Sequence, residues 1–203
     1  MKPLILPYEG KVEFESPYGY RKLNGETVWH NGIDLVGLDS KLIISPCDGV
    51  VKTSTIVTDT NNKTWEWGNY VRIDYEDISV FLCHMSERFV SKGDIVSQGM
   101  LIGIEGNTGY SFGSHCHFEV RKNTSNIINP CELLGIPNHY GIYENYVDND
   151  PVGHDWSEKE IQWAIENKIL RGYSETEADY KLEQNITREE AIVLLYRLFK
   201  LIN

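Results

Sequence analysis

The sequence predicts a mainly β protein, in which an antiparallel β-sheet domain is followed by a small α-helical domain. Between about residues 12 and 130, short runs rich in valine, isoleucine and tyrosine alternate with glycine, aspartate and asparagine turns. No convincing helical period is present in that stretch. From Trp156 onward the apolar residues follow a helical period instead, which marks a second domain.

Four segments carry the strand prediction. They are 42–57 (LIISPCDGVVKTSTIV), 68–86 (GNYVRIDYEDISVFLCHMS), 100–109 (MLIGIEGNTG) and 115–122 (HCHFEVRK). Their spacing suits antiparallel strands in packed sheets. The glycine-rich stretch 103–114 is expected to form turns and the wall of a groove, because no G-K-[ST] motif and no helix follow it, as a phosphate loop requires.

Two amphipathic helices are expected near the end of the chain. In 156–172 four apolar residues fall on one stripe, and Gly172 is a plausible end to the helix. In 186–202, Thr187 and Glu190 form a capping box ahead of an apolar run.

The segment before these helices has proline, glycine and asparagine without a sustained period, and its tyrosines suggest that part of it packs on something. We therefore expect a β domain over 1–135, a linker or ordered connector over 136–152, and a helical domain over 153–203.

The charge balance limits the partners. The 203 residues carry a formal net charge of -11 and give a pI of about 5.0, which argues against duplex nucleic acid or an anionic membrane as the main partner. The chain begins without an apolar run of signal-peptide length and has no membrane-spanning run. The sequence as written predicts synthesis in the cytoplasm without a signal peptide.

The cysteines show no C-x-x-C pairing, and without a signal peptide buried, reduced thiols are expected. Cys83 and Cys116 each adjoin a histidine, which raises the question of metal ligation. Neighbours on a strand point to opposite faces, so Cys116 should face the core, away from His115 and His117.

Two short motifs carry potential chemistry. In HNGID, His30 and Asp34 are four residues apart, and in SHCH, His115 and His117 are two apart, so that in extended strands each pair would share a face. Two imidazoles and a carboxylate suit a catalytic zinc with an open fourth position, and further histidines, such as His84, suit proton transfer. Spacing alone leaves structural, metal-binding and acid–base roles open.

The surrounding residues resemble those of the lysostaphin/LytM-type zinc endopeptidases, which cut peptide bonds in bacterial peptidoglycan. The matching motifs, in order, are HNGIDLVG, SPCDGVV, WGNYVRIDY, the long run from LCHMS to HCHFEVRK, and NP, and they span roughly residues 16–130. The resemblance implies a compact antiparallel β fold with a long substrate groove.

By this resemblance, His30, Asp34 and His117 are the zinc ligands, and His84 and His115 are the catalytic histidines. One of the two catalytic histidines would act as general base and the other would stabilise or protonate the tetrahedral intermediate. The sequence does not assign which does which.

The departures from the family pattern are mild. Cys116 replaces the usual leucine between the two histidines, Ser114 stands where proline is common, and LCHMS replaces a more typical tyrosine-x-histidine-leucine run. Glu119 shares strand parity with His115 and His117, so it either orients a ligand or simply packs.

The end of the chain resembles a single S-layer-homology repeat, through an early tryptophan and the segments AIENKIL and ITREEAIVLLYR. Such repeats imply attachment to secondary cell-wall polysaccharide. A single copy could instead form a homodimer, bind weakly or pack on the peptidase.

We therefore expect a zinc endopeptidase that acts on the peptidoglycan of the bacterial cell wall, of the phage endolysin kind. The bond that it cuts stays open between glycine cross-bridges and links from D-alanine to the diamino acid. The alternative is a noncatalytic wall-binding or regulatory module that keeps the fold. A lipoyl-type carrier domain is disfavoured, because no lysine lies between Gly93 and Phe118.

Overall fold

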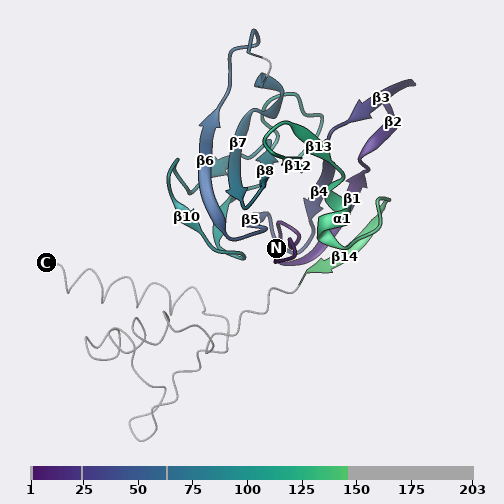
Figure 1. Cartoon of the computed structure of the whole chain (residues 1–203). Helices are drawn as coiled ribbons and strands as arrows, with labels where there is room; N and C mark the ends of the chain where they lie inside the picture. Colours follow the sequence, from purple (N-terminus) through teal and green to yellow (C-terminus); the bar gives the residue numbers. More distant parts are fainter. Residues whose placement is uncertain (1, 24, 63, 146–203) are drawn as a thin grey trace, which may run out of the picture. The chain divides into compact units, whose positions relative to one another are not determined.

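The computed structural model describes residues 2–23, 25–62 and 64–145 (Figure 1). The chain divides into two compact units, Met1–Val147 and Asp148–Asn203. The two expected helices and the expected domain 153–203 lie outside the described residues. In the first unit the prediction of a mainly β, antiparallel fold is confirmed.

The strands alternate with short turns along the first unit. Their bounds are β1 (Gly10–Ser16), β2 (Gly19–Leu23), β3 (Glu26–His30), β4 (Ile33–Gly37), β5 (Leu42–Ile44), β6 (Gly49–Ile56), β7 (Asn69–Tyr75), β8 (Ile78–Cys83), β9 (Glu87–Arg88), β10 (Ile95–Val96), β11 (Leu101–Ile104), β12 (Cys116–Lys122), β13 (Asn126–Ile128) and β14 (Gly141–Asn145). A 3₁₀ turn, η1, spans Trp65–Trp67, and a helix, α1, spans Pro130–Leu134. No helix among these described residues is long and apolar enough to cross a membrane.

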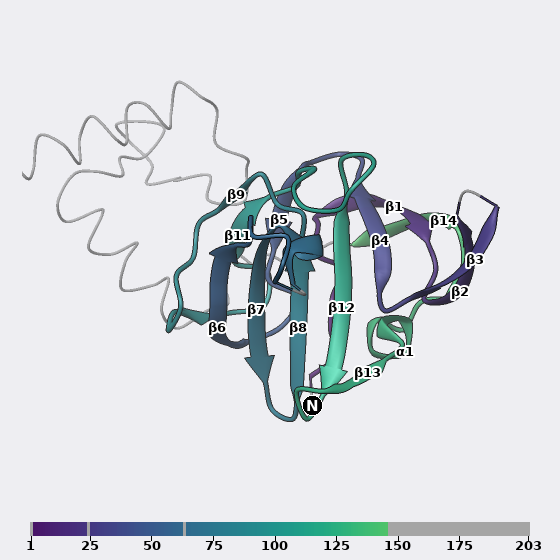
Figure 2. The same cartoon turned by 90° about the horizontal axis from the view of Figure 1, so that it is seen from above.

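The main sheet has nine strands within the described part of the chain. Its order is β10-β6-β7-β8-β12-β4-β1-β14, with β13 added beside β12. Figure 2 shows β6, β7, β8, β12 and β4 side by side. A second sheet has the order β5-β11-β9, and β2 and β3 form a separate hairpin.

Alternation along the strands divides their side chains between two faces. In β8, Leu82 joins the large core, whereas Phe81 and Cys83 belong to a smaller cluster on the other face. The large core also includes Ile43 from β5 and Ile102 from β11, so the smaller sheet packs over this face of the main sheet. The face opposite the core is thereby left available for a site.

The cysteines are buried and free, as expected. Cys116 lies in the large core together with Leu35 and Phe118, which confirms that it faces away from the neighbouring histidines. Burial raises the pKa of the Cys47 thiol to about 12, so this group stays protonated at neutral pH.

Two features go beyond the sequence-based expectations. Residues 141–145, in the expected connector, form β14, which pairs with β1 and brings Tyr143 edge-on to Phe14 with ring centroids 6.0 Å apart. The short helix α1 was not anticipated, although its signals are readable. The Asn129 side chain caps it by accepting from the backbone N–H of Cys131, and Gly135 ends it in the left-handed conformation.

Candidate metal centre

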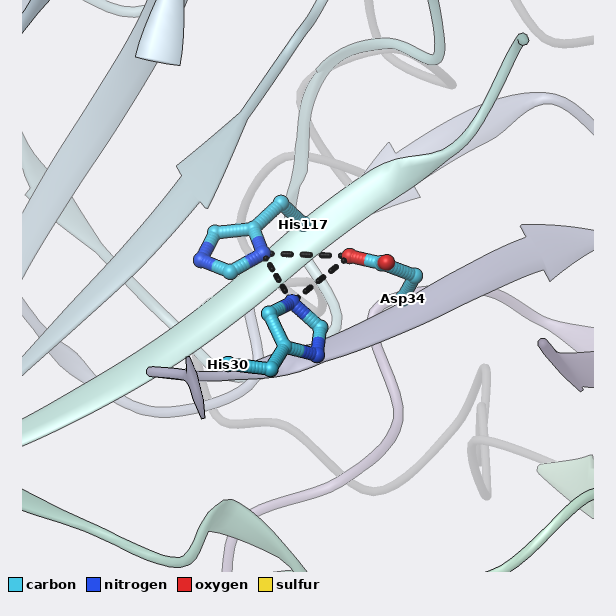
Figure 3. A group of neighbouring side chains, drawn as sticks. All are labelled: His30, Asp34 and His117. Carbon is cyan, nitrogen blue, oxygen red and sulfur yellow. Dashed lines mark hydrogen bonds and ion pairs between the residues drawn. The ribbon is translucent and has the colours of Figure 1, made fainter. Parts of the chain in front are cut away.

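Three predicted ligands meet on the sheet face opposite the core (Figure 3). His30 ends β3, Asp34 lies in β4, and His117 lies in β12 directly opposite Asp34 in the antiparallel register. His30 Nε2 lies 2.9 Å from His117 Nδ1 and 3.2 Å from Asp34 Oδ1, and His117 Nδ1 lies 3.0 Å from Asp34 Oδ1. All three residues are buried.

The spacing argument assumed that His30 and Asp34 share one extended strand, but they lie on two strands, β3 and β4. A bend at residues 31–32 separates β3 from β4, so the two side chains converge around a corner. Gly32 is required there, because a Cβ atom would lie 2.3 Å from the carbonyl oxygen of Phe118.

The outer nitrogen of each of the two histidines has an acceptor that orients the ring. His30 Nδ1 lies 2.9 Å from the carbonyl oxygen of Pro17, which can only accept, so this nitrogen carries the proton. His117 has a carboxylate oxygen on both sides, with Glu119 at 3.5 Å from Nε2 and Asp34 at 3.0 Å from Nδ1. Burial lowers the pKa of His117, but the two carboxylates outweigh it and raise the pKa to about 9, so without a metal both ring nitrogens carry a proton at neutral pH.

The inner nitrogen of His30 presents its lone pair to His117 Nδ1, and a cation bound between them would take the place of the proton on His117 Nδ1. Once that proton has left, the three donor atoms repel one another unless a cation lies between them. Ligands around a tetrahedral zinc, at about 2.0–2.1 Å from the metal, lie about 3.4 Å apart. The separations observed, 2.9 to 3.2 Å, need only a small outward movement, so these residues fit a zinc ion.

Asp34 is held on its second oxygen as well. Arg21, from β2, donates from an Nη atom to Asp34 Oδ2 at 2.7 Å. Burial raises the pKa of the Asp34 carboxyl, but the contacts with His117 and His30 outweigh it and hold the pKa well below its ordinary value. The Asp34 carboxyl is therefore anionic at every physiological pH.

His84 lies beside the three ligands, directly after β8. Its backbone has φ of +66°, a left-handed conformation that a non-glycine residue adopts at a cost of about 1–3 kcal/mol. Its Nδ1 donates to the carbonyl oxygen of Thr108 at 2.8 Å, which leaves Nε2 without the proton. Burial first, and then the charges of His117 and His115, lower the pKa of His84 to about 3.

His115 completes the group of five. Its ring centroid lies 4.7 Å from that of His84, and its Nε2 lies 3.5 Å from Asp34 Oδ1. Its Nδ1 donates to the carbonyl oxygen of Gly113 at 2.9 Å, so Nε2 is again the unprotonated nitrogen. The structure thus brings together all five residues that the sequence singled out.

Glu119 lies beside His117, as strand parity predicts. Its carboxylate is 1% exposed and is shared between His117 Nε2 and the Nε of Arg121. Arg121 in turn lies over the rings of Trp67 and Phe81. A buried carboxylate on the outer nitrogen of a ligand histidine fixes the orientation of the ring and makes the inner nitrogen a stronger ligand.

The five residues line one groove of about 710 Å³. One wall is the β2–β3 hairpin, with Trp29 half exposed, and the other is the glycine-rich loop, with Tyr110 and with Phe112 71% exposed. The expected use of this loop as a groove wall is confirmed. Gly109 permits it, because its φ is +73° and a Cβ atom would lie 2.4 Å from the carbonyl oxygen of Glu66.

Arg21 and Thr108 belong to the site but were not singled out from the sequence. Arg21 holds Asp34 from a separate hairpin. The Thr108 hydroxyl donates to the carbonyl of Met85 and accepts from the backbone N–H of Asn69, and so supports the turn that carries His84. Neither residue has a distinctive spacing, so no pattern would have identified them.

An antiparallel β domain with two histidines and an aspartate converging in a groove, beside two further histidines, is the architecture of a metallopeptidase. The chain belongs to peptidase family M23, whose model matches residues 28–130. Residues 149–192 match the S-layer homology domain.

Two curated relatives share the peptidase region. The chain is 33% identical over 118 residues to the peptidoglycan DD-endopeptidase ShyA of Vibrio cholerae, covering 56% of this chain and 26% of that protein. It is 30% identical over 115 residues to the DD-carboxypeptidase/endopeptidase Mpg of Neisseria meningitidis, covering 55% of this chain and 25% of that protein. The chain thus spans about a quarter of the length of each.

Solved structures show the same fold. The catalytic domain of lysostaphin from Staphylococcus simulans superposes with a TM-score of 0.52 at 26% identity, covering 60% of this chain and 91% of that one. The SpoIIQ–SpoIIIAH pore forming complex gives a TM-score of 0.53 at 24% identity, covering 66% and 92%, which is a likeness of fold alone.

Proposed function

We propose that this protein is a zinc-dependent endopeptidase that hydrolyses peptide links of bacterial peptidoglycan. The observation that carries the proposal is the convergence of three atoms able to ligate a metal, from His30, Asp34 and His117, beside two histidines in an open groove. Membership of the M23 family and the names of the relatives support it.

His30 Nε2, Asp34 Oδ1 and His117 Nδ1 would hold the zinc ion. When bound, zinc supplies Lewis acidity, which polarises a carbonyl group and lowers the pKa of water. The protein contributes the fixed geometry, through Pro17, Arg21 and Glu119 on the outer atoms of the ligands.

His84 and His115 would move the protons. Hydrolysis adds water to the carbonyl carbon and breaks the C–N bond, so one proton must leave the water and one must reach the departing amine. Each of these rings presents an unprotonated Nε2. One of the two rings would accept the proton from the water, and the resulting imidazolium would pass that proton to the nitrogen of the departing amine. A ring that becomes an imidazolium also stabilises the negative charge on the tetrahedral intermediate.

Burial, together with the charges of His117 and His115, lowers the pKa of His84 to about 3, which makes His84 a weak acceptor for a proton from water and leaves the role of general base to His115. His84, with its ring fixed against Thr108 and no proton on Nε2, would then accept a hydrogen bond from the attacking water and help to orient it.

The names of the two relatives, a DD-endopeptidase and a DD-carboxypeptidase/endopeptidase, favour a cross-link between D-configured residues over a glycine bridge. The S-layer homology match supports attachment of the protein to the wall through residues 149–192, with secondary cell-wall polysaccharide as the expected ligand. Dimer formation through this segment and an origin in a phage endolysin stay predictions.

The test is the digestion of purified cell walls of several cross-link chemistries by the zinc-loaded protein, with the released fragments identified by mass spectrometry. Loss of turbidity that a chelator abolishes and zinc restores is expected, together with new amino termini at one type of cross-link. His115→Ala should keep zinc and lose activity, whereas His117→Ala should lose both.

His139→Ala is the matched control, because His139 is exposed and does not line the groove. If the wild-type protein binds walls but releases no fragments from any of them, and the two active-site variants behave like it, the noncatalytic alternative holds instead.

A further inference from the structure

Glu105 is a buried carboxylate beside the groove that the proposed chemistry does not use. It follows β11, is 4% exposed, and has no solvent-accessible side-chain surface. A carboxylate so placed costs several kcal/mol unless hydrogen-bond donors surround it.

Four donors from four separate segments surround the Glu105 carboxylate. Oε2 accepts from the Tyr8 hydroxyl at 2.8 Å and from the backbone N–H of Gly37 at 3.0 Å. Oε1 accepts from Lys41 Nζ at 2.9 Å and from the Ser114 hydroxyl at 2.7 Å. The four lone-pair positions of the carboxylate are thus in use, and it forms a fixed point between the N-terminal segment, β4 and the groove wall.

Ser114 connects this fixed point to the exposed loop that carries His115. The backbone N–H of Tyr110 donates to the carbonyl of Glu66 at the start of the loop, and the backbone N–H of His115 donates to the carbonyl of Gly106 at its end. Between those two, the hydrogen bond from Ser114 ties the described loop to the body of the domain.

The loop in turn sets the orientation of the His115 ring. The carbonyl oxygen of Gly113, one residue before Ser114, accepts from His115 Nδ1, and this bond directs Nε2 toward Asp34. On the other side, Gly106, which takes the backbone N–H of His115, directly follows Glu105. The Ser111 hydroxyl also lies 3.3 Å from His115 Nδ1 and itself donates to the Gly113 carbonyl. The support at Gly113 is thus held by the loop that Ser114 anchors to Glu105.

We propose that Ser114 and Glu105 act as positioning residues for His115, an inference that rests on the proposed peptidase function. In this chain the hydroxyl of Ser114 provides a restraint through its hydrogen bond to a buried anion, which is stronger than a bond to a neutral group.

The test compares Ser114→Ala and Ser114→Thr with the wild-type full chain loaded with zinc, and uses Ser91→Ala, an exposed serine outside the groove, as the control. Ser114→Ala should lower kcat for a defined cross-linked muropeptide by about tenfold, because small displacements of a catalytic group reduce rates this strongly. KM and zinc content should not change, and Ser114→Thr should restore most of the rate.

A second measurement does not depend on activity. In the zinc-loaded protein, the imidazole NMR signals of His115 should shift or broaden in Ser114→Ala, while those of His30 and His117 stay in place. Glu105→Gln places an amide N–H₂ group opposite hydrogen-bond donors and should have a larger effect on the same signals. This variant also weakens the bonds to Tyr8, Gly37 and Lys41, so it supports the inference but does not decide it.

The outcomes separate the two proposals. A wild-type protein that cuts no cell wall contradicts the proposed function, while the NMR signals still test the positioning of His115. A Ser114→Ala protein with full kcat and unchanged His115 signals overturns the inference. So does a Ser114→Ala protein that loses zinc or folds poorly, because the role of the serine is then structural only.

Discussion

Glu119 should control how tightly the centre holds zinc, although it touches no metal. We consider Glu119→Gln and Glu119→Ala. The carboxylate is 1% exposed and lies 3.5 Å from His117 Nε2, at the long end of a hydrogen bond. Removing an outer partner of a ligand histidine typically weakens metal binding by about 10- to 100-fold.

The long contact places the expected loss for Glu119→Gln near the lower end, at about tenfold, or about 1.4 kcal/mol. The amide keeps an acceptor for His117 Nε2 but loses the negative charge that makes the ring a stronger ligand. Glu119→Ala should lose more, because it removes the acceptor and leaves the Arg121 guanidinium without its buried partner.

The assay is a competition titration of the metal-free protein with zinc and a chromophoric chelator at constant pH. The visible spectrum of the cobalt-substituted protein then reports on the geometry of the ligands. Arg72→Met is the matched control, because it breaks an arginine–carboxylate pair on β7, which β8 separates from β12, without contact to His117. Equal zinc affinity in the wild type and both Glu119 variants, with identical cobalt spectra, would refute the reasoning.

Three further predictions concern the supports of the groove. Thr108→Val should reduce activity by about tenfold with zinc retained, because the Thr108 carbonyl orients His84 and the lost hydroxyl holds this residue through its hydrogen bonds to Met85 and Asn69. Kinetic and metal assays on one preparation check this. Gly109→Ala should destabilise the fold by about 1–3 kcal/mol, seen as a lower melting temperature, because its φ is +73° and the new Cβ would meet Glu66; an unchanged melting temperature would contradict it. Burial raises the pKa of Glu105, but its four hydrogen-bond donors outweigh burial, so the pKa in the folded protein lies below the ordinary value of 4.5. The stability that Glu105 contributes is therefore complete above pH 4.5 and is lost as the pH falls through the pKa of the folded protein. Between neutral pH and pH 3, Glu105→Gln should therefore lose less stability than the wild type, which a melting series on the metal-free protein measures.

The sequence predicted those features that depend on local rules. Alternation along a strand was enough to separate Cys116, which packs in the core, from His117, which faces the groove. Turn residues and β-rich runs gave the fold class, since each signal lies within a few residues of what it predicts. The cap of α1 is a local signal of the same kind, but the helix was not predicted because it is too short to show a helical period.

Features that depend on long-range pairing were not predictable in this way. The register that sets His117 opposite Asp34 joins strands more than 80 residues apart, and nothing local specifies it. Glu105 shows the same difficulty, because its four partners come from segments that no pattern connects. The motif resemblance indicated the four histidines and the aspartate of the site, but not these supporting contacts.

The orientation of the histidines shows why the supports escape sequence reasoning. Each of His30, His84, His115 and His117 gives its outer N–H to an acceptor, so that each inner nitrogen is free for a metal or a proton. Three of the acceptors are backbone carbonyls, which belong to Pro17, Thr108 and Gly113. Any residue type supplies a carbonyl, so these supports are set by the path of the chain and leave no mark in the composition. Glu119 is the side-chain acceptor among the four, and a single substitution there removes an acceptor while the path of the chain is kept.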